Sequence, residues 1–164
     1  MTPERRTIIR GSISSCGPYR YRLTRYWGPG KFMPFIMLNP SVADAEIDDP
    51  TIRRCMGFAR REGAGGIVVG NIYAFRATKP EVLWKAADPF GPDNDEALAH
   101  IAIGAVADDM PIVCAWGAAA QVSNVVTAKL FSHGARCVCL GKTKEGRPRH
   151  PLYVHSQQAL EPFP

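Results

Sequence analysis

Four short apolar runs, separated by segments with helical patterning, constrain the fold of this chain more than any other feature. They cover residues 34–38, 66–70, 112–116 and 136–140. Continuous apolar runs of this length are typical of strands that are buried on both faces, as in parallel sheets. We therefore predict an α/β protein: a three-layer α/β/α sandwich around a central four-stranded parallel sheet.

The segments between these runs carry helix signals. Asp49 is a favourable N-cap and Pro50 suits the first helical position, so a helix should begin there and end near Arg61. Further helices are expected over residues 80–87, 92–108 and 118–132. Right-handed crossovers through these helices would place all four strand carboxyl ends at one edge of the sheet.

The N-terminal segment has a different pattern. Residues 7–27 are rich in Ile, Tyr, Thr and Arg, and residues 19–23 alternate with a period of two. A break at residues 14–18 predicts a β-hairpin, which could join the main sheet or pack separately. We expect one domain over residues 1–164, with N-terminal strands in 1–30 and an α/β core in 31–155.

Composition excludes several classes of protein. An apolar content of 46% suits a folded globular chain, and no apolar stretch approaches the roughly 18–20 residues that span a bilayer. No segment resembles a signal peptide. We therefore expect a cytoplasmic protein with no membrane partner; the sequence does not indicate an oligomeric state.

The five cysteines do not form a recognisable metal or disulfide pattern. Their number is odd and none are spaced as Cys-x-x-Cys. We predict that they are small buried side chains in a reducing compartment, and we expect no metal and no cofactor.

The net charge of +5 is concentrated in two clusters. One contains six arginines within residues 5–25, and the other consists of Lys142, Lys144, Arg147, Arg149 and His150. Such clusters suit binding of the phosphates of a nucleic acid or nucleotide, although a solvated positive surface is the simpler interpretation.

Each apolar run ends at a distinctive motif. These motifs are Leu38-Asn39-Pro40-Ser41, Val68-Val69-Gly70-Asn71, Val113-Cys114-Ala115-Trp116-Gly117 and, after the last run, His150-Pro151-Leu152. Ligands of open α/β sheets bind at the carboxyl ends of the strands. The motifs should therefore converge on one cleft, although they are spread over a hundred residues.

In this order, the motifs resemble those of the uracil-DNA glycosylase superfamily, and the Asn-Pro form is closest to its mismatch-specific, thymine-DNA-glycosylase-like branch. Residues 39–55 also resemble an uncharacterised family of bacterial and phage proteins with a domain of unknown function. The resemblance implies a nucleobase site on an α/β/α sandwich, over roughly residues 15–155.

The resemblance implies roles for individual residues. Asn39 would hold the attacking water and His150 would donate a hydrogen bond to the base. Asn71 would read the base edge, Leu152 would replace an extruded base, and Lys142, Arg147 and Arg149 would bind phosphates. Pro40, Ser41, Trp116 and Gly117 would complete the substrate-binding surface.

Four of these residues have a simpler structural explanation. Asn39 could close an Asx turn, Asn71 could cap a strand end, His150 could be merely exposed, and Leu152 could anchor the C-terminal segment in the core. Leu152 also stands where the glycosylases have serine.

Three functions therefore remain open. The first is hydrolysis of an N-glycosidic bond in DNA or a nucleotide. The second is a non-catalytic module that binds a nucleobase or nucleic acid. The third is a metal-dependent phosphate enzyme that uses the acidic residues Asp44, Glu46, Asp48, Asp49, Asp93 and Asp95.

Overall fold

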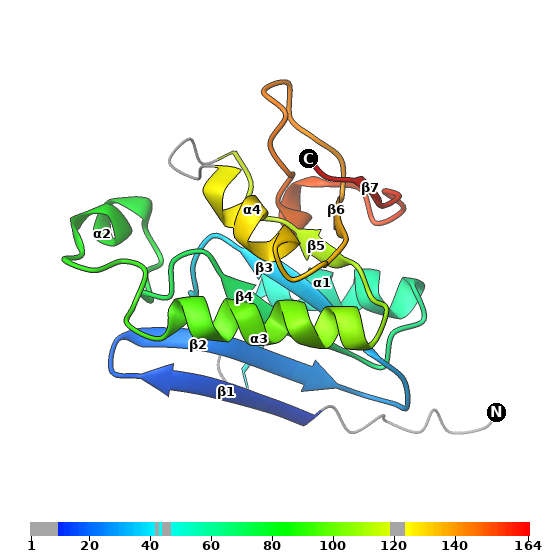
Figure 1. The fold of residues 1–164 in the computed structure, drawn as a ribbon, viewed down its shortest axis with the longest axis horizontal. Helices are drawn as coiled ribbons and strands as arrows, with labels where there is room; N and C mark the ends of the chain where they lie inside the picture. Colours follow the sequence, from blue (N-terminus) through cyan, green and yellow to red (C-terminus); the bar gives the residue numbers. More distant parts are fainter. Residues whose placement is uncertain (1–9, 42, 44–46, 119–123) are drawn as a thin grey trace.

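A computed structural model describes residues 10–41, 43, 47–118 and 124–164. The chain forms a mixed α/β structure in which helices cover both faces of one sheet (Figure 1). The sheet has seven strands in the order β1-β2-β4-β3-β5-β6-β7.

The four apolar runs form the parallel centre of this sheet. They correspond to β3 (Phe32–Met37), β4 (Gly66–Asn71), β5 (Ile112–Cys114) and β6 (Cys137–Cys139). β3 pairs in parallel with β4 and β5, and β5 pairs in parallel with β6. The central parallel strands are therefore confirmed, and their carboxyl ends lie at one edge.

The expectation of a four-stranded sheet is wrong, because the sheet extends at both edges. The N-terminal hairpin of β1 (Arg10–Cys16) and β2 (Tyr19–Tyr26) joins it through antiparallel pairing of β2 with β4. β7 (Glu161–Pro162) pairs antiparallel with β6. These additions cover edges that four parallel strands would leave exposed.

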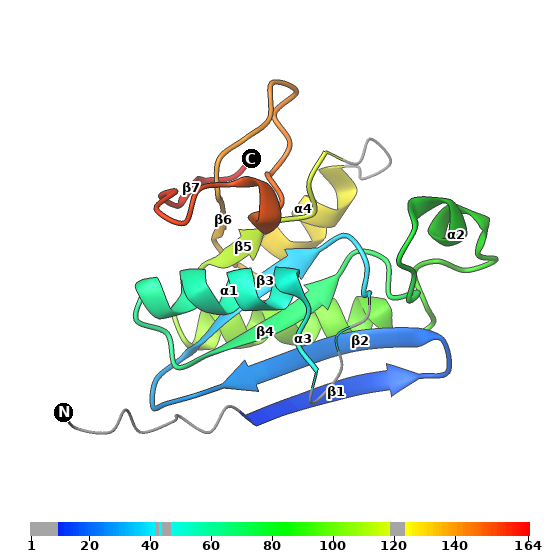
Figure 2. The same cartoon turned by 180° about the vertical axis from the view of Figure 1, so that it is seen from behind.

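The helices lie on opposite faces of the sheet. α1 (Pro50–Arg61) is on one face, and α3 (Asn94–Ala107) and α4 (Asn124–Phe131) are on the other (Figures 1 and 2). The short α2 (Pro80–Lys85) lies at one end of the molecule, and a 3₁₀ turn, η1, covers Pro151–Tyr153. The helices begin and end within a few residues of the predicted bounds, except that residues 119–123 are not described.

Alternation along β3 produces two hydrophobic cores. Phe35 and Met37 pack with α1, whereas Ile36 packs on the opposite face with Ile101 of α3. These side chains are almost fully buried, as expected for a strand between two layers of helix.

The start of α1 follows the predicted capping chemistry. The carboxylate of Asp49 accepts a hydrogen bond from the backbone N of Ile52 at 2.8 Å, and Pro50 occupies the first turn. The cap therefore fixes the start of α1 at Asp49.

Cysteine burial largely follows the prediction. Cys55, Cys114, Cys137 and Cys139 are buried, whereas Cys16 is exposed at the hairpin turn.

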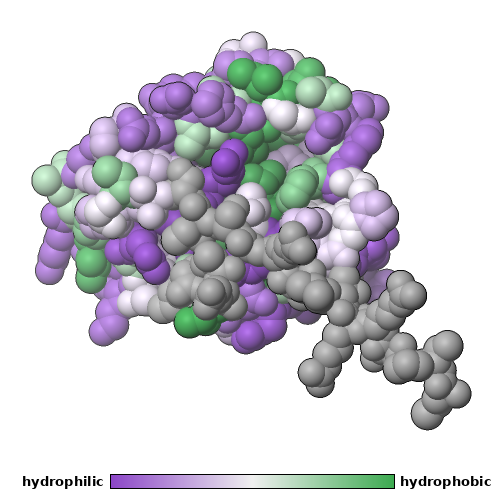
Figure 3. All heavy atoms as spheres, turned by 90° about the horizontal axis from the view of Figure 1, so that it is seen from below, coloured by the Kyte–Doolittle hydropathy of each residue, from purple (hydrophilic) through white to green (hydrophobic). Residues whose placement is uncertain are grey.

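Within the described part of the chain, no helix is both long enough and apolar enough to cross a membrane. On the face seen from below, hydrophilic residues surround smaller hydrophobic patches (Figure 3).

Candidate functional site

A cavity of about 190 Å³ lies at the carboxyl ends of β3 and β4. Five of the residues selected from the sequence line it, namely Asn39, Ser41, Asn71, Trp116 and His150. Sites for drug-sized ligands usually measure about 300–1,000 Å³. This cavity therefore suits a ligand about the size of a single small ring system.

Asn39 is held rigidly at the end of β3. Its Nδ2 donates to the carbonyl oxygens of Ala77 at 2.8 Å and Pro40 at 3.1 Å. Because both partners are acceptors, the amide nitrogen must face them, and the Oδ1 atom remains an acceptor for a ligand or water. An aspartate at this position would set a carboxylate against two carbonyl oxygens, which accounts for the amide.

Asn71 places a buried donor at the cavity. Its side chain is 1% exposed, and its Nδ2 has no hydrogen-bond partner among the described residues. Leaving a buried polar group unpaired costs about 1–3 kcal/mol. A buried polar group without a partner in a native structure calls for an explanation, and a ligand or water in the cavity would supply one.

Asn94 of α3 fixes the chain beyond Asn71. Its Nδ2 donates to the carbonyl oxygens of Asn71 at 2.9 Å and Ile72 at 3.0 Å. The backbone of Asn71 is therefore held by its pairing with Met37 of β3 and by the hydrogen bond from Asn94 of α3.

His150 is a neutral donor. Its Nδ1 accepts a hydrogen bond from the backbone N of Leu152 at 3.1 Å, so the ring proton lies on Nε2. Burial lowers the pKa of His150 below its ordinary value, while the charge of nearby Asp49 opposes that shift in part. The imidazole therefore offers a hydrogen bond without carrying a positive charge near neutral pH.

Arg54 ties the His150 segment to α1. Its Nε donates to the carbonyl oxygen of Pro151 at 3.2 Å, and its Nη2 donates to that of Val154. The guanidinium thus holds both ends of the turn that follows His150 and fixes the histidine relative to Asp49 and the cavity.

The Trp-Gly motif supports the cavity from β5. Trp116 is buried and makes an edge-to-face contact with Phe163 at 5.5 Å between ring centroids. Gly117 has a φ of +79°, and a β-carbon there would lie 3.5 Å from the Cβ of His150. Its backbone N donates to the carbonyl oxygen of Pro148 at 2.9 Å. Gly117 therefore joins the β5 end to the segment that carries His150.

Pro40 contributes through its backbone. It is buried, and its carbonyl oxygen accepts both from Asn39 and from the backbone N of Ala77 at 3.0 Å. The Asn-Pro motif is thus fastened to the chain before α2.

The remaining predicted residues do not line the cavity. Lys142, Arg147 and Arg149 lie on a hairpin that projects from the end of β6 (Figure 1). Leu152 lies in η1 and is 38% exposed, so the interpretation of this side chain as a core anchor is wrong.

Four further polar residues line the cavity: Arg20, Asp49, Thr51 and Thr78. The sequence selected Asp49 only as an N-cap and a possible metal ligand, and it did not select the other three as site residues. Arg20 is 2% exposed, and its Nη1 donates to the carbonyl oxygen of Ala43. The sequence analysis placed it in the basic cluster of residues 5–25. The alternation of residues 19–23 did not reveal its burial, because it places Arg20 on the face opposite to Tyr19 and Tyr21.

Arg25, from the same cluster, is also buried. Its Nε lies 2.7 Å from Oδ1 of Asp48, and the side chains are 2% and 24% exposed. Its Nη2 donates to the carbonyl oxygen of Ile47 at 3.1 Å. This ion pair fastens the loop before α1 to β2.

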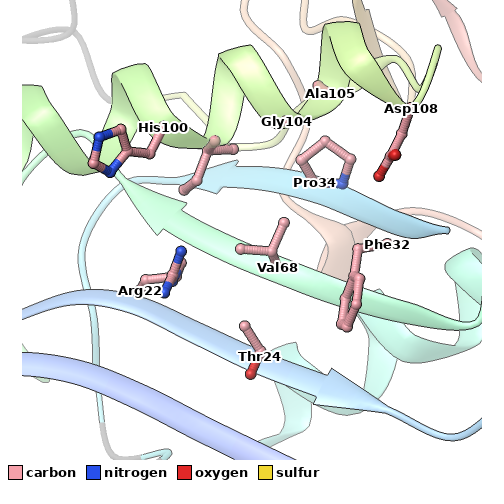
Figure 4. Close-up of a pocket in the computed structure, with 10 residues that line it drawn as sticks. Arg22, Thr24, Phe32, Pro34, Val68, His100, Gly104, Ala105 and Asp108 are labelled. Atoms are coloured by element: carbon pink, nitrogen blue, oxygen red, sulfur yellow. The ribbon is translucent and has the colours of Figure 1, made fainter.

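A second, larger groove of about 300 Å³ lies between α3 and strands β2, β3 and β4 (Figure 4). Phe32, Pro34 and Val68 form its apolar floor, and Arg22, His100 and Asp108 lie at its margin. None of the strand-end residues reaches it. We therefore assign the candidate site to the smaller cavity, where the polar groups converge.

The acidic residues do not gather around a common point in the described structure. Asp48 pairs with Arg25, Asp49 caps α1, and Asp95 lies 3.3 Å from Lys129. No group of three or more His, Cys, Asp or Glu side chains that could hold a metal occurs among the residues described. Asp44 and Glu46 lie outside these residues.

Together, the fold and the cavity define a mixed α/β protein with a small polar site at the carboxyl ends of its parallel strands. The model of a family described as "Protein of unknown function (DUF1643)" matches residues 20–152. The chain belongs to this family. No curated protein and no solved structure matched the chain.

Proposed function

We propose that this chain binds a nucleobase in the strand-end cavity and hydrolyses its N-glycosidic bond, in DNA or in a nucleotide. One observation carries the proposal: Asn39, Asn71 and His150, separated by up to 111 positions in the sequence, line one cavity of about 190 Å³. The same residues carry the resemblance to the uracil-DNA glycosylase superfamily. The parallel β4-β3-β5-β6 core between helical layers supports a fold of that kind.

The cavity offers donors and acceptors that suit the edge of a base. Asn71 Nδ2 is a donor without a hydrogen-bond partner among the described residues, and His150 Nε2 carries a proton. Both would bind carbonyl oxygens, which favours an oxo-base such as uracil or hypoxanthine. Trp116 supplies an apolar wall.

The chemical step needs a water and a departing base. Asn39 Oδ1 would orient the water by accepting a hydrogen bond from it, since an amide is too weak a base to deprotonate it. As the bond from the sugar carbon to the water oxygen forms and its bond to the base nitrogen breaks, the proton that the water loses would go to the departing base. His150 would stabilise the negative charge that grows on the base as the bond breaks. These roles require no metal and no cofactor.

Phosphate contacts would come from the projecting hairpin. Lys142, Arg147 and Arg149 lie on the chain that leads directly into His150. If they contact duplex DNA, the logarithm of affinity should fall with the logarithm of salt by about 0.9 per contact. Leu152 is exposed beside His150 and could fill the space of an extruded base.

The purified protein should generate abasic sites in oligonucleotides. We suggest a panel that carries uracil, hypoxanthine, mismatched thymine or an alkylated base, with alkaline cleavage as the measurement. Excision of at least one base in the presence of EDTA is the expected result. No excision from any substrate would contradict hydrolysis and favour a binding module, and activity that EDTA abolishes would favour a metal-dependent enzyme.

A further inference from the structure

We propose that the nucleic acid bound by this chain is single-stranded, with Tyr153 stacking on the base next to the one in the cavity. The inference rests on the proposed function and identifies its partner. Tyr153 is 77% exposed, the largest exposed fraction among the exposed large apolar side chains of the described structure. A lone exposed apolar side chain is ordinary, so the argument depends on how this ring is held.

Tyr153 is fixed against the cavity histidine. Its backbone N donates to the carbonyl oxygen of His150 at 3.0 Å, within the turn η1. Its ring centroid lies 5.4 Å from that of the His150 imidazole, at an interplanar angle of 46°. Because Arg54 also holds this turn on α1, the ring is a preformed platform that loses little freedom when it binds.

A cationic hairpin lies immediately before this platform. The backbone N of Thr143 donates to the carbonyl oxygen of Arg147 at 2.8 Å, and that of Arg149 donates to Gly141 at 3.0 Å. The hairpin therefore has a defined shape. It carries four basic side chains and one acidic one, and Lys142, Lys144 and Arg149 are exposed.

The combination of a fixed aromatic ring and neighbouring cations matches a single strand better than a duplex. Single-stranded nucleic acids bind through stacking of successive bases on aromatic rings and through contacts of the backbone with cations. In a duplex, neighbouring bases already cover both faces of each base. A single strand also enters a base-sized cavity without the cost of breaking a base pair.

The positions of the cavity, Tyr153 and the basic hairpin define a path for a single-stranded nucleic acid. One base would occupy the cavity against His150, the adjacent base would stack on Tyr153, and the phosphates would follow the hairpin. This arrangement uses the exposed ring that the proposed chemistry leaves without a role.

Fluorescence anisotropy with the intact chain of residues 1–164 tests the inference. The probes are a labelled 12-nucleotide single strand and the same strand annealed to its complement. The single strand should bind more tightly. Tyr153→Ala should weaken its binding about 5- to 100-fold, the effect of losing one stacked base, and Tyr153→Trp should retain most of the affinity.

Tyr26 provides a matched control. It is also an exposed tyrosine, at 42%, but it pairs with Gly66, at the end of β4 opposite to Asn71. Tyr26→Ala should leave binding unchanged. Lys142→Gln should reduce the salt dependence of binding by about 0.7 in the logarithmic slope. Lys31→Gln, directly before β3, should not change it.

Two results would overturn the inference: equal or tighter binding of the duplex, or equal affinities for the Tyr153→Ala and Tyr26→Ala variants. Thermal unfolding of each variant shows whether it is folded. Binding of free nucleobases to the unaltered protein is measured separately. If nucleobases bind but Tyr153 has no effect, only this inference fails; if none binds, the proposed function fails.

Discussion

Replacing His150 with alanine should lower the rate of base excision by about 10²- to 10³-fold, with little change in nucleic-acid affinity. The neutral imidazole offers a hydrogen bond whose value increases as negative charge grows on the departing base. Removal of a single donor of this kind from an enzyme site has an effect of that size on the rate. Single-turnover excision kinetics and a binding assay on the same substrate measure the two quantities.

His155 is the matched control for this substitution. Its Nδ1 also accepts a hydrogen bond from the backbone two residues later, that of Gln157 at 3.0 Å, but its side chain is exposed and does not line the cavity. His155→Ala should therefore leave the rate unchanged. Equal rates for the two histidine variants would show that His150 has no part in the chemistry.

Asn39→Ala should abolish excision while DNA binding stays nearly intact. The substitution removes the Oδ1 acceptor for water and also the two hydrogen bonds that fasten the loop to Ala77 and Pro40. Unfolding measurements therefore accompany the kinetics. Excision that persists in both Asn39→Ala and His150→Ala would contradict the roles assigned to these residues.

The second large effect concerns stability. Asp48→Ala removes the carboxylate 2.7 Å from the Nε of Arg25, a guanidinium that is only 2% exposed. Loss of one partner of a buried ion pair typically costs about 3–5 kcal/mol, since a charge remains in a site of low polarity. Because Asp48 is itself 24% exposed, we expect a loss near 3 kcal/mol in the free energy of unfolding, measured with urea.

The pair of Lys129 with Asp95 is the control for this prediction. Its nitrogen and oxygen lie 3.3 Å apart, but the side chains are 60% and 83% exposed. Water screens such a pair, so Asp95→Ala should cost less than about 1 kcal/mol. Similar losses from the two aspartate substitutions would contradict the structural role given to Asp48.

Features that depend on short stretches of sequence were predicted well. The four apolar runs became β3 to β6 with only small changes in their ends, and Asp49-Pro50 begins α1 as expected. In each case the signal is local: a buried strand needs a continuous apolar run, and a helix start needs a side chain that can satisfy its exposed backbone N–H groups.

Features that depend on long-range pairing were not predictable. The sequence left open whether the N-terminal hairpin joins the sheet, and it gave no sign that β7 would extend the other edge. The burial of Arg20 and Arg25 was not predicted for the same reason: it depends on the pairing of β2 with β4. A polar residue on an alternating strand can face either side, and the neighbouring strand decides which.

The candidate site combines both kinds of information. The rule that parallel strands end at one edge was sufficient to select Asn39, Asn71 and Trp116. His150 lies beyond the end of β6. Its position beside Asn39, Asn71 and Trp116 depends on the hairpin of residues 141–149 and on the hydrogen bonds of Gly117 and Arg54. The orphaned amide of Asn71 and the tautomer of His150 could be determined only from the three-dimensional contacts.

The central claim is that the strand-end cavity, which Asn39, Asn71 and His150 line, binds a nucleobase through Asn71 and His150. Titration of ¹⁵N-labelled protein with free uracil, thymine, hypoxanthine and adenine tests it most directly, with the side-chain amide signals of the two asparagines as the readout. We expect at least one oxo-base to shift both signals saturably, and Asn71→Ala to remove that binding. The account would be contradicted if no base bound, or if binding shifted only signals from the groove between α3 and β2.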